Sequence, residues 1–106
     1  MYTVLVAARA EQDLKEQHDW WAANRSAAQA ARWYRRILER ILSLEHSPHA
    51  HPLADEEDVW PFAVRQFNFG LGHRPTHRVL FAIRETDVVV FRVRHLSQAP
   101  ITADDL

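Results

Sequence analysis

The chain has 106 residues, no cysteine and a formal net charge of −1. A chain of this length is expected to form one domain, residues 1–106, whose fold needs neither disulfides nor metal. The near-neutral charge gives no indication of nucleic-acid binding. No segment approaches the roughly 20 apolar residues of a membrane span, so the sequence predicts a soluble, cytoplasmic protein without membrane contact.

The N-terminal part shows one strand pattern followed by two helix patterns. Alternation from Tyr2 to Val6 predicts a short strand, and apolar residues at helical spacing predict a helix from about residue 8 to 23. Ser26 and Gln29 have the spacing of a capping box, which predicts that a second helix starts there. This second helix has an apolar stripe, so the two helices are expected to form an antiparallel hairpin. The stripe comprises Ala30, Trp33, Tyr34, Ile37, Leu38, Ile41 and Leu44.

A long connection follows between residues 46 and 63. It contains three prolines and the acidic run 55–58, which together exclude a regular helix. A connection of this length is uncommon unless it is functional or packs through its own side chains, and the run 59–62, Val-Trp-Pro-Phe, is a candidate anchor. Three closely spaced histidines also occur here, but nothing in the sequence completes a zinc site, so we expect neither metal nor cofactor. They are His46, His49 and His51.

The last third of the chain reads as three strands, at 64–70, 76–84 and 88–95. Their short connections predict antiparallel neighbours, so the fold class is α+β, with order β-α-α-β-β-β and the helical hairpin on one face of a mostly antiparallel sheet. Strand alternation predicts that the helices cover one apolar face, to which Arg65 and His95 also belong by parity. The predicted apolar face comprises Val79, Phe81, Ile83, Val89, Phe91 and Val93, and the opposite face carries Arg78, Arg84, Arg92 and Arg94.

Charge is distributed unevenly along this part of the chain. Between residues 65 and 95 there are six arginines and two acidic residues, whereas the run 55–58 is entirely acidic. Two interpretations remain open: an accessible basic face that binds an anionic partner, or arginines that pair with the acidic run.

The order and spacing of these elements resemble the RelE/ParE toxin superfamily, the toxins of bacterial type II toxin–antitoxin modules. The resemblance spans nearly the whole chain and rests on the first strand with Ala10-Glu-Gln-Asp-Leu14, the tryptophan-rich hairpin, Val64-Arg65, His77-Arg-Val-Leu-Phe81 and the closing Val-Arg-His95. It implies one of two activities. RelE-like members cut messenger RNA on the ribosome without a metal, and ParE-like members block DNA gyrase.

For RNA cleavage, the resemblance implies arginines that stabilise the phosphate, a terminal histidine as acid or base and a carboxylate partner. The candidate catalytic residues are Arg65, Arg78, His95 and Glu57. The chain has a single lysine, Lys15, and a pI near 6.6, whereas nucleases that dock on the ribosome tend to be strongly basic. The composition therefore favours the ParE-like branch, with a metal-independent endoribonuclease and a non-toxic binding module as alternatives.

The resemblance also implies a cognate antitoxin that forms a hetero-oligomer with the toxin. Such a partner is expected to use an apolar groove on the helical hairpin, an open sheet edge and an acidic segment. The residues predicted to bind antitoxin or target are Arg78, Arg84, Arg92 and Arg94.

Overall fold

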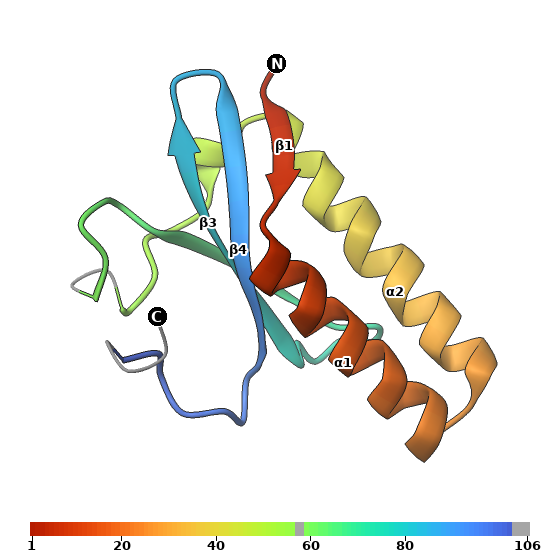
Figure 1. The fold of residues 1–106 in the computed structure, drawn as a ribbon. Helices are drawn as coiled ribbons and strands as arrows, with labels where there is room; N and C mark the ends of the chain where they lie inside the picture. Colours follow the sequence, from red (N-terminus) through yellow and green to blue (C-terminus); the bar gives the residue numbers. More distant parts are fainter. Residues whose placement is uncertain (57–58, 103–106) are drawn as a thin grey trace.

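In the computed structural model, which describes residues 1–56 and 59–102, two helices pack on one face of a four-stranded sheet (Figure 1). The later part of the long connection and residues 96–102 lie on the other face (Figure 1). The predicted α+β class and element order are confirmed. The elements are β1 (Thr3–Val6), α1 (Ala8–Asn24), α2 (Ala27–Leu42), the single-turn 3-10 helices η1 (Ser43–Glu45) and η2 (Pro48–Ala50), β2 (Arg65–Phe69), β3 (His77–Arg84) and β4 (Asp87–His95).

The helical hairpin has the ends that the sequence predicts. The Ser26 hydroxyl accepts a hydrogen bond from the Gln29 backbone N–H at 3.0 Å, which confirms the serine half of the predicted capping box. The stripe of α2 supplies the buried side chains Trp33, Ile37 and Ile41, which belong to the main core together with strand residues and Leu44 of η1. Ala30 is also buried. In contrast, Tyr34 is 36% exposed at the flank of the hairpin.

The sheet has the strand order β1-β4-β3-β2. Only β1 runs parallel to its neighbour, with Thr3 opposite Asp87 and Val6 opposite Val90, and the other two pairs are antiparallel. The first and last strands of the chain are therefore adjacent in the sheet. None of the helices among residues 1–56 and 59–102 is long and apolar enough to span a membrane.

A β-bulge changes the predicted faces of β4. Leu80 pairs with Arg92 but the next residue of β3, Phe81, pairs with Val90, so Phe91 is an extra residue in β4. The prediction that Val89 and Phe91 face the helices is therefore wrong, because an inserted residue reverses the alternation on its N-terminal side. Val88 and Val90 lie in the main core instead, together with Val93 beyond the bulge.

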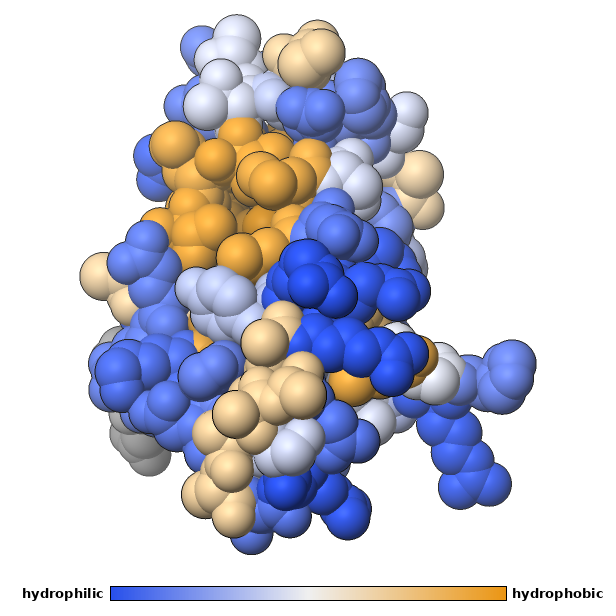
Figure 2. Space-filling view, turned by 90° about the vertical axis from the view of Figure 1, so that its right-hand side faces the viewer, coloured by the Kyte–Doolittle hydropathy of each residue, from blue (hydrophilic) through white to orange (hydrophobic). Residues whose placement is uncertain are grey.

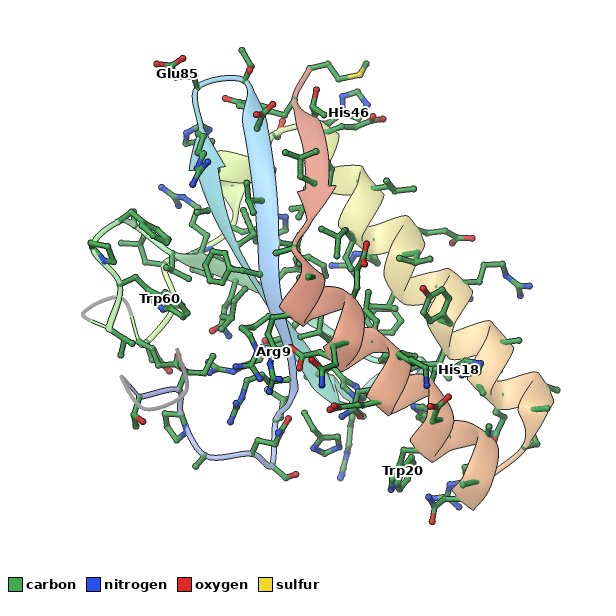
Figure 3. The ribbon with its side chains drawn as sticks, in the orientation of Figure 1. Arg9, His18, Trp20, His46, Trp60 and Glu85 are labelled. Atoms are coloured by element: carbon green, nitrogen blue, oxygen red, sulfur yellow. The ribbon has the colours of Figure 1, made fainter. Side chains whose placement is uncertain are left out.

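Because of the bulge, the Phe91 side chain lies on the far face of the sheet, in a second apolar cluster. Trp60 packs on it with ring centroids 4.8 Å apart, and Phe62 lies at 5.9 Å. Figure 3 shows Trp60 extending from the long connection toward the sheet. The buried members of this cluster are Ala54, Val64, Leu80 and Ile101. The prediction that the run 59–62 anchors the connection is thus confirmed.

Candidate functional site

Arg78 is buried on the sheet face that lies away from the helices. Its guanidinium forms a two-pronged ion pair with Glu56, with the Nη1–Oε1 distance at 2.8 Å, and it also donates to the side-chain oxygen of Gln66. The Glu56 carboxylate in turn accepts the backbone N–H of Ile101 at 3.0 Å. Burial, and then the nearby cation Arg94, lower the pKa of Arg78 from its usual value. A single buried carboxylate therefore joins the sheet to the segment after β4.

Arg94 lies directly opposite Arg78 in the sheet and is also buried. Its Nη2 donates to the backbone carbonyl of Ala99 at 2.7 Å. The segment that follows β4 thus contacts this arginine through a backbone oxygen, while Ile101 inserts into the far-face cluster.

Arg92 pairs with the first helix. Its Nε donates to the Asp13 carboxylate at 2.8 Å, and the same carboxylate accepts the backbone N–H of Val93 at 2.9 Å. Both charged side chains are buried, with exposed fractions of 5% for Asp13 and 6% for Arg92. Beyond the point where β1 ends, Asp13 therefore provides the hydrogen-bond acceptor for the edge of β4.

The expectation of an accessible arginine face is corrected by these contacts. Arg78, Arg92 and Arg94 do lie on the predicted strands, but each has an exposed fraction below 10%. A buried guanidinium needs partners to offset its loss of hydration. Arg78 and Arg92 each have a carboxylate partner, whereas Arg94 bonds to the Ala99 carbonyl and its Nε is buried without a partner. Arg84, at the end of β3, is exposed. The interpretation in which arginines pair with the acidic run is confirmed for Arg78 and Glu56.

The residues predicted for RNA cleavage lie apart from one another. Arg65 donates to the His51 carbonyl at 2.7 Å and pairs with Phe81, whereas His95 pairs with His77, four positions away along β3. That separation corresponds to roughly 13 Å along a strand. Arg78 projects from the opposite face of the sheet. Glu57 lies outside the described residues.

His95 and His77 meet at the end of the sheet where α1 also ends. Their ring centroids are 5.0 Å apart. His77 bonds to Gln17 of α1 through Nε2 at 2.9 Å and to the Thr76 hydroxyl through Nδ1 at 2.7 Å. Burial, with a smaller contribution from His95, lowers the pKa of His77 to about 4. His77 is therefore neutral at physiological pH.

A cavity of about 470 Å³ opens beside this histidine pair. It is lined by Gln17, Trp20, Trp21, Arg25, Thr76, His77, His95, Ser97 and Gln98. Of these residues, the sequence analysis named only His95 as a candidate site residue. Trp20 is 49% exposed, and Figure 3 shows it at the C-terminal end of α1. The signal that could have revealed His77 is its parity with Val79 and Phe81, which places it on the same face as His95.

A second surface feature is an apolar patch between β1 and the C-terminal half of α2. Hydrophobic atoms gather in the upper half of the face in Figure 2. Leu42 is 59% exposed, while Val4, Val6 and Leu38 are partly buried against the core. These four residues are called the apolar patch below. It lies beside β1, which is an edge strand of the sheet.

The other edge strand, β2, is partly covered. Residues 52 and 53 of the long connection run alongside this edge. Leu53 forms a β-bridge with Arg65, and the Gln66 N–H donates to the Pro52 carbonyl. Beside β1, the N–H of Tyr2 donates to the Glu45 carbonyl at 3.0 Å, just before the strand begins. The edge of β1 from Thr3 to Val6 is the more accessible of the two.

Metal coordination finds no support in the part of the chain that the structure describes, where no group of three or more His, Cys, Asp or Glu residues is close enough to hold an ion. His51 contacts the rings of Phe67 and Phe81, and His49 contacts Tyr2. Burial, then Arg40 and Arg65, lower the pKa of His51.

Comparisons with known proteins agree with the fold. The family model described as "ParE toxin of type II toxin-antitoxin system, parDE" matches residues 4–100. A solved structure described as "Chromosomal ParDE TA system from P. aeruginosa" contains a chain that is 16% identical and superposes with a TM-score of 0.73, over 92% of this chain and 98% of that one. No curated protein matches at a significant level of sequence similarity. The family match covers nearly the whole chain, and the chain therefore belongs to the ParE toxin family of type II toxin–antitoxin systems.

Proposed function

We propose that this protein inhibits bacterial growth in the cytoplasm by acting on DNA gyrase, and that a cognate antitoxin neutralises it in a hetero-oligomer. Membership of the ParE family supports the toxin role. The structural relative comes from a ParDE toxin–antitoxin system, which supports an antitoxin partner.

The separation of Arg65, Arg78 and His95 is the observation that favours gyrase over messenger RNA. Cleavage of RNA requires an acid or base and a cation within hydrogen-bond reach of a single phosphodiester. In this fold Arg65 is engaged by backbone carbonyls, Arg78 by Glu56 and His95 by Ser97. Such an arrangement suits a toxin that acts by binding.

Within this proposal the predicted binding arginines divide into two groups. Arg84 is exposed at the end of the β3–β4 hairpin and is available to a partner directly. Arg78, Arg92 and Arg94 are buried, and their contacts hold the loop, α1 and the segment after β4 on the sheet. Their contribution to partner binding is therefore to shape the surface.

The apolar patch and the edge of β1 are the proposed antitoxin surface. An edge strand presents unpaired backbone groups to which an extended segment can add, and the neighbouring apolar side chains suit an amphipathic helix. These two features lie side by side, so one partner can occupy both.

The test is a supercoiling assay with purified gyrase, run in parallel with a translation extract. The proposal predicts inhibition of supercoiling, DNA damage on expression and an intact message. Inert behaviour toward active gyrase contradicts it. Message cleavage that disappears in Arg65→Ala and His95→Ala would instead establish the ribonuclease, and expression without a growth defect would indicate a non-toxic binding module.

A further inference from the structure

We propose that the cavity beside His77 and His95 is a binding site for a nucleotide, specifically for a planar base together with its phosphate. Such a site is independent of the cellular target of the toxin. Three properties of the cavity walls support it: an exposed indole, a set of hydrogen-bond donors and an uncompensated positive charge.

The donors follow from the hydrogen bonds that the two histidines make. His77 Nε2 lies 2.9 Å from the Gln17 side-chain oxygen, so that oxygen accepts the bond and the Gln17 amide nitrogen remains to donate to a ligand. His95 Nδ1 accepts from the backbone N–H of Ser97 at 3.0 Å, so its Nε2 carries a proton. Two hydrogen-bond donors therefore belong to the walls of the cavity.

The charge in the cavity comes from Arg25, the residue at the C-terminal end of α1. The described residues that line the cavity include no aspartate or glutamate to compensate it. The C-terminal end of α1 carries only about half an elementary negative charge, which the full positive charge of Arg25 outweighs. A ligand with an anionic group is favoured here over a cation.

The indole of Trp20 indicates that the part of the ligand away from the anionic group is a planar ring. Trp20 is half exposed and stands edge-on to Trp21, with ring centroids 5.6 Å apart and an interplanar angle of 90°. This geometry holds the indole while leaving part of its surface open to stack on a planar ring. A volume of about 470 Å³ is also within the range of pockets that hold small organic ligands.

A nucleotide satisfies all three properties, since its base stacks and carries acceptors while its phosphate pairs with a guanidinium. The ligand can be a free nucleotide or one unit of a single strand. The experiment is an NMR titration of the full chain with adenosine 5′-monophosphate, adenosine, inorganic phosphate, a single-stranded hexanucleotide and a duplex of the same sequence. The signals followed are those of the Trp20 indole and the His95 ring.

We expect saturable binding of the monophosphate at millimolar concentrations or below, with weaker binding of adenosine and of inorganic phosphate. Trp20→Ala should weaken binding about tenfold, the usual effect of losing one stacking partner. Arg25→Gln should weaken binding of the monophosphate and leave adenosine unchanged. Two variants outside the cavity, Lys15→Gln on the same helix and Tyr34→Ala on α2, serve as matched controls and should bind as the parent chain does.

Tighter binding of the single-stranded hexanucleotide than of the monophosphate assigns the site to nucleic acid, and similar affinities assign it to the free nucleotide. The proposal is overturned if the monophosphate produces no saturable shifts, if inorganic phosphate binds as tightly as the monophosphate, or if Trp20→Ala, with its fold confirmed by its NMR spectrum, binds as the parent does. Equal binding of duplex and single strand also overturns it, because a stacked base pair cannot enter the cavity.

Discussion

The carboxylate of Asp13 binds the side chain of Arg92 and the backbone N–H of the following residue at the same time. Helix α1 thereby takes over the free edge of β4 where β1 stops. One side chain thus performs two tasks that are usually separate, since it neutralises a buried cation and completes the hydrogen bonding of a strand.

Replacing this carboxylate should destabilise the protein strongly. Asp13→Ala leaves the Arg92 guanidinium and the Val93 N–H buried without their acceptor, and we expect a loss of about 3–5 kcal/mol in the free energy of unfolding. Urea denaturation followed by circular dichroism measures this loss. The control is Asp19→Ala, which removes an exposed ion pair with Lys15 and should change the free energy of unfolding far less, because water screens that pair. Similar losses in the two variants would show that the Asp13 contacts are not specially important.

Glu56 should control how firmly the segment after β4 is held. Glu56→Gln removes the charge opposite Arg78 and weakens the acceptor of the Ile101 N–H. We expect faster hydrogen exchange at Ile101 and a loss of about 3 kcal/mol in stability. Glu45→Gln, on the opposite side of the sheet, is the matched control for exchange at this position. Unchanged exchange at Ile101 in Glu56→Gln would contradict the role of Glu56 in holding the segment after β4.

The low pKa of His77 predicts a specific pH dependence of stability. Between pH 6.5 and about 4 the unfolded chain binds a proton at this histidine while the folded chain does not. The contribution of His77 to the free energy of unfolding is therefore fully present above pH 6.5. It decreases by up to about 3 kcal/mol as the pH falls toward 4.

The measurement is the free energy of unfolding at several pH values in the parent chain and in His77→Gln, which cannot titrate. The difference between these two free energies of unfolding should change across this interval. Parallel pH profiles for the parent chain and His77→Gln would contradict the lowered pKa of His77.

The apolar patch predicts a separation between binding and stability. Leu42 is mostly exposed, so Leu42→Glu should change the free energy of unfolding by less than about 0.5 kcal/mol. The same change places a charge in the proposed interface and should weaken antitoxin binding at least about tenfold. Calorimetric titration with the cognate antitoxin measures it, with Arg36→Glu on the same helix as a control for added negative charge. Unaltered affinity in Leu42→Glu would move the antitoxin to another surface.

The sequence predicted the elements well because their signals are local. Ser26 marks the start of α2, the prolines define the long connection, and alternation identifies the strands. The assignment of Val89 and Phe91 failed because a β-bulge depends on how two strands pair, and the sequence of one strand does not contain that information.

The candidate site was predicted less completely, for a related reason. The sequence left open whether the arginines of β3 and β4 are accessible or paired, because their partners lie far away in sequence: Glu56 is 22 positions from Arg78, and Asp13 is 79 positions from Arg92. The cavity is likewise formed where α1 ends against the far end of the sheet. No spacing rule brings Trp20 and His95 together.

The pairing of β1 with β4 has a consequence for synthesis on the ribosome. Thr3 pairs with Asp87, 84 positions later, so the N-terminal strand has no neighbour in its own sheet until β4 has left the exit tunnel. Contacts of such high sequence separation form late and slowly. The sheet edge at β1 that we propose for the antitoxin therefore exists only after β4 has been synthesised, so an antitoxin that uses this edge binds after that point.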